Sequence, residues 1–244
     1  MNIVYHLTDN YARISGTSIV SVFENNRDVD EINIYLIENG FSKKTKDKFT
    51  FLANKYGRKV FFIPLPDVNG GEYDLGLVRI KKNWVFDSYS RLFLDYLLPD
   101  NVARVIYVDG DTLVLGSLNE LWNMELGGKC CAACMDCVSK PYYTLFGIDE
   151  NNRYCNSGLI LIDLQAWKEK NIAERVKAYV KKNNGYVFFM EQTVFNVILQ
   201  NETVCLPLEY NVSSLIQVFS YNELIQLRKP IHFYTAEEVE IAQK

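Results

Sequence analysis

The sequence predicts a single α/β domain over residues 1–244, built on a mostly parallel β-sheet, and three observations lead to that prediction. Strand-like and helix-like segments alternate through the first half of the chain. The strand-like segments are almost continuously apolar, which is typical of strands covered on both faces. The chain is also long enough, and at 48% hydrophobic residues apolar enough, to bury one sizeable core without a linker or repeat.

The first half is expected to contain four strands and three helices. The strands are predicted at 2–8, 31–38, 59–65 and 104–109. The helices are predicted at 10–26, 42–57 and 85–99, where apolar residues recur at helical spacing. Ser42 is a suitable N-cap for the second helix, and Gly57 a suitable end.

The second half is less regular. Strands are expected at 129–136, 156–164 and 229–234, with one or two helices over 164–183 and another at 190–200.

Charge and segment length exclude several classes of protein. The net charge of −4 and a pI near 5.4 argue against a nucleic-acid partner or an anionic-membrane footprint. The N-terminus lacks a basic segment followed by an apolar one, so no secretory signal is expected. No run of eighteen apolar residues occurs, so no transmembrane segment is expected. We therefore expect a cytoplasmic protein with at most peripheral membrane contact.

Cysteines are clustered in "KCCAACMDCV". The spacing of Cys131, Cys134 and Cys137 invites comparison with a metal cluster. The segment is small and apolar, however, and alternate residues of a strand face opposite sides. A second cysteine pair at zinc-site spacing is also missing from the sequence. Reduced, buried thiols are the favoured interpretation.

Two carboxylates, Asp109 and Asp111, end the apolar strand in "RVIYVDGDTLVLGS", with Gly110 between them. Residues i and i+2 of a strand point to the same side, so the two acids repel each other unless a cation lies between them. Both can converge on one Mg²⁺ or Mn²⁺, and Gly110 leaves room for a ligand. Ligands of open α/β sheets bind beyond the carboxyl ends of the strands, where this pair lies. We therefore favour ion binding over a solvated Asp-Gly-Asp turn.

Other chemistries also follow an apolar strand with such acids. In the haloacid-dehalogenase phosphatases the motif is Asp-x-Asp-x-Thr, but Thr112 follows Asp111 directly, and three strands come first. A nucleotidylyltransferase is a weaker option, because "TDNYAR" after the first strand is not a Gly-rich phosphate loop. In nucleotide-sugar transferases, Asp-x-Asp holds a metal against the diphosphate of the donor.

Six segments in order resemble glycosyltransferase family 8, whose members have the GT-A fold and include retaining galactosyl- and glucosyltransferases of lipopolysaccharide biosynthesis and glycogenin. The segments are "TDNYA", "SYSRLFL", "VIYVDGDTLVLGSLNELWNMEL", "YCNSGLILIDLQAW", "EQTVFN" and "IHFY". The resemblance runs from residue 2 to about residue 235. It implies a retaining hexosyltransferase that moves glucose or galactose from a UDP-sugar to a hydroxyl of a saccharide or glycan acceptor.

The resemblance also assigns roles to residues. The nucleotide-binding residues would be Thr8, Asn10, Tyr11, Asp109, Gly110 and Asp111, with Tyr11 stacking on uracil. Thr8 stands where members often carry an acid. The metal ligands would be Asp109, Asp111 and His232, and the imidazole favours Mn²⁺, with Mg²⁺ as the alternative.

The donor sugar would lie against Arg91, Asp136, Asn156, Ser157, Gly158 and Gln192. Arg91, Glu191 and Gln192 would be catalytic, with Gln192 on the anomeric face opposite the leaving group. Gln192 is an amide and thus a poor nucleophile, so front-face substitution is favoured over double displacement through Glu191.

Members usually continue after the His strand with Gly and then Lys-Pro-Trp, whereas this sequence runs "HFYTAEEVEIAQK". The departure keeps open a UDP-sugar-binding protein with little turnover.

Overall fold

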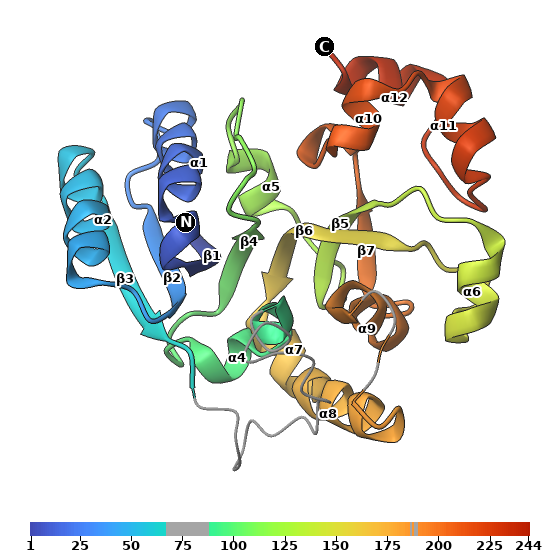
Figure 1. Ribbon diagram of the computed structural model, residues 1–244, viewed down its shortest axis with the longest axis horizontal. Helices are drawn as coiled ribbons and strands as arrows, with labels where there is room; N and C mark the ends of the chain where they lie inside the picture. The colour runs from blue at the N-terminus through green and yellow to red at the C-terminus, as the bar shows by residue number, and fades with distance from the viewer. Residues whose placement is uncertain (67–87, 186, 188–189) are drawn as a thin grey trace.

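The computed structural model describes residues 1–66, 88–185, 187 and 190–244 (Figure 1). Within these ranges one mixed sheet has the strand order β3-β2-β1-β4-β6-β5-β7. The strands are β1 (Asn2–Thr8), β2 (Asn33–Asn39), β3 (Lys59–Pro64), β4 (Arg104–Val108), β5 (Cys131–Met135), β6 (Cys155–Asp163) and β7 (Thr203–Leu206). All neighbours are parallel except β6, which runs antiparallel to both β4 and β5. The predicted α/β class with a mostly parallel sheet is confirmed.

Helices cover both faces of the sheet (Figure 1). The longer helices are α1 (Ala12–Asn25), α2 (Lys43–Lys55), α8 (Ile172–Lys182), α9 (Met190–Ile198) and α11 (Tyr221–Arg228). The shorter ones are α4 (Leu94–Leu97), α5 (Asn119–Asn123), α6 (Lys140–Phe146), α7 (Leu164–Glu169), α10 (Ser214–Val218) and α12 (Ala236–Ala242). Alternate residues of each central strand enter two separate cores, as Ile3 and Val4 of β1 do. This two-sided burial explains why the strands are nearly all apolar.

Local signals placed most of the first-half elements correctly. Ser42 caps α2 by accepting a hydrogen bond from the Thr45 N–H at 3.2 Å, and Gly57 has the left-handed φ of 64° that ends a helix. The helix expected at 85–99 is interrupted in its described part. A 3-10 turn (Ser90–Leu92) and α4 are separated by Phe93, at φ −122°, and residues 85–87 lie outside the described part of the chain. Residues 89–94 are all buried, so packing rather than amphipathic periodicity decides their conformation.

The strand predicted at 229–234 is wrong. Pro230 makes only an isolated bridge with Ser139, and Lys229 before it is the left-handed end of α11, at φ 46°. Tyr234 is buried instead, and its hydroxyl accepts from the Met135 N–H at 2.8 Å and donates to the Leu206 carbonyl at 2.7 Å. The C-terminal sequence then folds as α12, which begins with a capping box formed by Thr235 and Glu238.

The cysteine-rich segment is the core strand β5. Cys131 and Cys134 are fully buried, and all six cysteines are free thiols. Burial raises the pKa of Cys131 and of Cys134 to about 12, which keeps both thiols protonated at neutral pH. Among the described residues, no group of three His, Cys, Asp or Glu side chains is arranged to hold a metal ion. In the same part of the chain, every helix is too short or too polar to cross a bilayer.

Candidate active site

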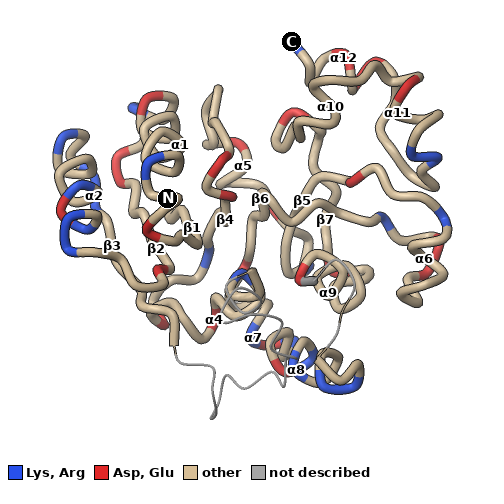
Figure 2. The backbone as a smooth tube through the Cα atoms, in the orientation of Figure 1, with Lys and Arg blue, Asp and Glu red and all other residues tan. Residues whose placement is uncertain are grey.

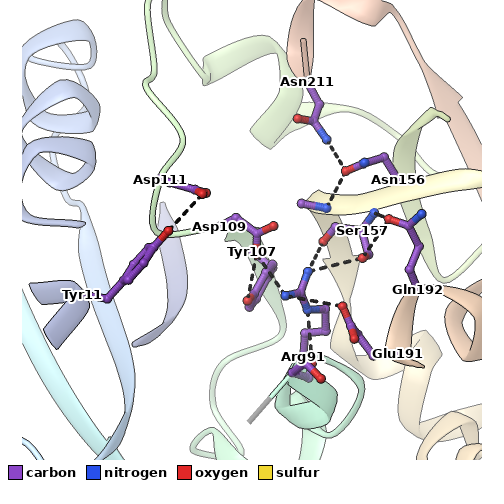
Figure 3. A network of polar contacts seen from close by, with 12 residues as sticks. Tyr11, Arg91, Tyr107, Asp109, Asp111, Asn156, Ser157, Glu191, Gln192 and Asn211 are labelled. Atoms are coloured by element: carbon purple, nitrogen blue, oxygen red, sulfur yellow. Dashed lines mark hydrogen bonds and ion pairs between the residues drawn. The ribbon is translucent and has the colours of Figure 1, made fainter. Parts of the chain in front are cut away.

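The site lies where β4 ends. Because β6 runs antiparallel to β4, the beginning of β6 reaches the same edge of the sheet. The Asp109 N–H donates to the Gly158 carbonyl at 2.8 Å, which extends the pairing of the two strands by one residue. The strand order thereby gathers at one place the predicted residues of two distant segments, 109–111 and 156–158 (Figure 3).

Arg91 is the central cation of this arrangement (Figure 3). The side chain is buried, and one guanidinium nitrogen, Nη2, lies 3.0 Å from Asp109 Oδ1 and 3.9 Å from Glu191 Oε1. The other, Nη1, donates to the Ser157 carbonyl at 2.6 Å and to its hydroxyl at 3.3 Å. The guanidinium also lies over the ring of Tyr107, 4.5 Å from its centroid. These contacts fix Arg91 before any ligand binds.

The two oxygens of Asp109 have different surroundings. Oδ1 contacts Arg91 and accepts from the Tyr107 hydroxyl at 3.3 Å. Among the described residues, no hydrogen bond reaches Oδ2. A Cβ at position 158 would lie 3.0 Å from Oδ2, so Gly158 keeps the space beside this oxygen open. Oδ2 is therefore the atom of Asp109 that is available to a ligand.

The charges around Asp109 are unbalanced. Burial raises the pKa of Asp109, and Asp111 and Glu191 add to the effect, while Arg91 opposes it. Burial alone would lower the pKa of Arg91, but Tyr107, Asp109 and Glu191 together outweigh it and raise that pKa. Two carboxylates, Asp109 and Glu191, face one guanidinium, and Asp111 adds negative charge near Asp109. A divalent cation would offset this excess.

Asp111 and Tyr11 lie on the solvent side of the site (Figure 3). The Tyr11 hydroxyl donates to Asp111 Oδ2 at 3.2 Å, and the ring is 40% exposed, which leaves a face free for stacking. The charge of Asp111 raises the pKa of Tyr11. Gly110 between the two aspartates packs tightly, because a Cβ there would lie 2.5 Å from Ser15 Oγ and 2.7 Å from Leu7 Cδ2.

Gln192 connects the remaining predicted residues. Its Nε2 donates to Asp136 Oδ2 at 2.9 Å, and its Oε1 accepts from the Ser157 N–H at 3.2 Å. Both ends of the amide are occupied, so the orientation of Gln192 is fixed. Asn156 Oδ1 accepts from the Gly158 N–H and from Asn211 Nδ2, each at 2.8 Å.

Two residues of the site were not predicted from the sequence. Tyr107 contacts Arg91 and Asp109, and its position two residues before Asp109 on β4 was the available signal. Asn211 lies directly after the 3-10 turn (Leu208–Tyr210) that follows β7, and no local pattern marks it. Only the pairing of β7 with β5 brings Asn211 to Asn156.

Thr8 and Asn10 lie at and just after the end of β1, beside Tyr11, but Asn10 lines a groove between α1 and α2. His6 of β1 is close enough to Arg91 to be affected by its charge. Burial lowers the pKa of His6 to about 4, and Arg91 adds to the effect.

His232 does not join the two aspartates. Its Nε2 lies 2.6 Å from the Glu150 carbonyl, and its ring packs edge-on against Tyr143 of α6. Helix α6 lies beyond the β5 and β7 end of the sheet, away from β4 (Figure 1). A metal role for His232 therefore stays a prediction and requires the segment around Pro230 to leave Glu150.

The remaining site chemistry fits a divalent ion. Asp109 Oδ2 and the Asp111 carboxylate offer hard oxygen donors, and Arg91 and Tyr107 orient Asp109 from behind.

The sheet order, the acids after β4 and the antiparallel β6 define a GT-A nucleotide-sugar transferase fold. The solved structure of a galactosyltransferase, LgtC, in complex with donor and acceptor sugar analogs aligns with a TM-score of 0.78 at 22% identity, over 97% of this chain and 85% of that one. A bifunctional glycosyltransferase, WbbM, aligns with a TM-score of 0.73 at 18% identity, over 100% of this chain and 49% of that one.

The chain belongs to glycosyltransferase family 8, which it matches over residues 2–237. A putative glycosyltransferase of Haemophilus influenzae is 29% identical over 86% of this chain, which spans 63% of that protein's length. The general stress protein A of Bacillus subtilis is 27% identical over 98% of this chain and 86% of that protein. A lipopolysaccharide 1,2-glucosyltransferase of Escherichia coli is 27% identical over 86% of this chain and 62% of that protein.

Proposed function

We propose that this protein is a cytoplasmic, retaining hexosyltransferase that moves glucose or galactose from a UDP-sugar to a hydroxyl of a saccharide acceptor. The observation that carries the proposal is the arrangement of the Asp109 carboxylate. One of its oxygens is fixed by Arg91 and Tyr107, and the other is open beside Asp111 at the strand end. Family membership and the lipopolysaccharide transferases among its relatives support the class of reaction.

In this proposal Asp109 and Asp111 hold Mn²⁺, or alternatively Mg²⁺, which when bound offsets negative charge on the diphosphate as a Lewis acid. Tyr11 stacks on the uracil, and Thr8 and Asn10 border the nucleoside. Arg91 supplies a fixed positive charge beside the diphosphate and the sugar.

The donor sugar lies against Asp136, Asn156, Ser157, Gly158 and Gln192. Gln192 is held by Asp136 and Ser157, so its amide dipole is already oriented towards a sugar that develops positive charge. Glu191 is engaged with Arg91 at 3.9 Å and contributes charge to that pair. The acceptor oxygen then bonds to the anomeric carbon on the face from which UDP departs. The bond from that carbon to the diphosphate oxygen breaks, and this oxygen takes the hydroxyl proton, so the anomeric configuration is retained.

A panel of UDP-sugars with and without Mn²⁺, measured by UDP release and by thermal shift, tests the proposal. We expect Mn²⁺-dependent UDP release from UDP-glucose or UDP-galactose, and a loss of about 100-fold or more in Asp109→Asn, since a missing transition-state charge contact costs about 3 kcal/mol. Absence of both turnover and thermal shift with every UDP-sugar would contradict it.

A UDP-sugar-binding protein with little turnover is the second candidate. The position of His232 against Glu150 rather than beside the aspartates favours it. Mn²⁺-dependent thermal shifts with UDP-sugars, without UDP release, would support this alternative.

A further inference from the structure

An open groove of about 1060 Å³ runs between α1 and α2, apart from the residues in Figure 3. Its apolar lining comes from Ala12 and Val20 of α1 and from Phe49 and Leu52 of α2. The groove is open at Gly16, because a Cβ there would meet nothing within 4 Å. The molecule therefore has a second concave surface, which meets the proposed nucleoside site only at Asn10 in the described part of the chain.

The rims of the groove are basic. Arg13, Lys43, Lys44 and Lys48 are exposed, and no ion pair joins any of the four to an acid in the described part of the chain. The lining also contains two acids, Asp9 and Asp47. Asp47 is exposed, and Asp9 accepts hydrogen bonds from the N–H and hydroxyl of Ser42, at 3.0 and 3.2 Å. Figure 2 shows basic positions along α2, at the edge of the molecule. A chain of net charge −4 thus carries a locally cationic surface.

A large apolar side chain projects from the same rim. Phe51 of α2 lines the groove and is 72% exposed. Lys48 and Lys44 lie one and two turns before Phe51 on the outer face of α2. The aromatic ring and the lysines therefore border one surface. A bilayer takes both features, since the aromatic ring enters the interface while lysines reach lipid phosphates.

We propose that this α1–α2 surface, made of Arg13, Lys43, Lys44, Lys48 and Phe51, docks the protein on membranes that contain anionic phospholipid. The charge complementarity is local, which explains why the net charge of the chain does not predict it. The surface is independent of the aspartate site, and vesicle binding requires neither nucleotide nor metal.

Flotation of the purified protein with vesicles tests the proposal. We expect binding to phosphatidylcholine vesicles that contain about a third phosphatidylglycerol, weak binding to pure phosphatidylcholine, and release in high salt. Lys44→Gln/Lys48→Gln should weaken binding at least tenfold, because each lysine near an anionic surface contributes about fivefold. Phe51→Ser should weaken it several-fold.

Matched controls separate this surface from general charge and folding. Lys181→Gln/Lys182→Gln removes the same charge from exposed positions of α8, and Leu145→Ser removes an exposed leucine of α6. Both should bind vesicles within twofold of the unaltered protein, and all variants should keep its melting temperature. Equal loss of binding in the α8 variant would overturn the proposal, as would no binding to either vesicle. Binding to polyglutamate instead of vesicles would assign the surface to an acidic protein and overturn it as well.

Discussion

Gly110 shows how little space the strand end leaves. A Cβ there would lie 2.5 Å from Ser15 Oγ and 2.7 Å from Leu7 Cδ2, and both neighbours are buried. Gly110→Ala is therefore expected to lower the free energy of unfolding by about 1–3 kcal/mol, the usual cost of overpacking.

Gly16→Ala is the matched control, because its Cβ would meet nothing within 4 Å in the interior of α1. This control should raise the free energy of unfolding by about 0.5–1 kcal/mol. Urea titration measures both. A Gly110→Ala variant as stable as the unaltered protein would contradict the packing at the strand end.

Tyr107 is expected to act as a positioning residue for Arg91 and Asp109. Tyr107→Phe keeps the ring under Arg91 and removes one hydrogen bond to Asp109, which is worth about 1 kcal/mol, so kcat/KM should fall about fivefold. Tyr107→Leu also removes the ring contact, worth about 0.5–2 kcal/mol, so its kcat/KM should be lower still. Steady-state kinetics with a UDP-sugar measure kcat/KM of both variants and of the unaltered protein.

A purely structural role for Tyr107 would lower the melting temperature of both variants and leave kcat/KM of the folded protein unchanged. That result would contradict the positioning role.

A local motif was sufficient to single out Asp109, Gly110 and Asp111 from one strand end. Arg91, Ser157, Glu191 and Gln192 were assigned by resemblance, and a network of contacts connects them to Asp109, while the roles of all seven residues stay predictions. Asn211 was missed, because its partner Asn156 is 55 residues away and no spacing rule connects them. His232 was assigned to the site by resemblance alone, and its observed contact with Glu150 depends on packing that the sequence does not encode locally.

Helix α4 contains a carboxyl group, that of Asp95, with one incompletely hydrogen-bonded oxygen. Its Oδ1 is buried without a hydrogen-bond partner in the described part of the chain, and burial raises the pKa of Asp95 to about 6 against Lys168 and Lys177. The folded state therefore keeps a proton between about pH 4 and pH 6 that the unfolded chain releases. The free energy of unfolding should fall as pH rises through this window and stay lower above it.

Asp95→Asn removes this cost and should raise the free energy of unfolding by roughly 1–3 kcal/mol at pH 7.5, with little change at pH 4. Urea titration at the two pH values checks the difference. Destabilisation of equal size at both would contradict the prediction.

Element boundaries followed local signals where these were strong. Ser42 and Gly57 mark the ends of α2 as predicted, because a cap and a positive φ are properties of single residues. The segment at 229–234 was apolar enough for a strand, but Lys229 is the left-handed end of α11 and Pro230 makes only an isolated bridge with Ser139. Strand pairing is a long-range property, so a short apolar run does not determine it.

At the scale of the whole molecule, alternation and apolar strands were sufficient to predict the α/β class. They did not predict that β6 runs antiparallel between β4 and β5, although this reversal brings Asn156, Ser157 and Gly158 to Asp109. That residues 1–244 form one domain stays a prediction. The net charge of −4 likewise conceals the basic α1–α2 surface, because a sum over the chain contains no information about position.

The central claim is that Asp109 and Asp111 hold a divalent cation against the diphosphate of a UDP-sugar. Titration calorimetry of UDP with and without Mn²⁺ tests it most directly, with Asp111→Asn as the site variant and Asp47→Asn of α2 as the charge control. The account predicts that Mn²⁺ tightens UDP binding at least tenfold in the unaltered protein and in Asp47→Asn, and has no effect in Asp111→Asn. Equal UDP affinity with and without Mn²⁺, or a full Mn²⁺ effect in Asp111→Asn, would contradict it.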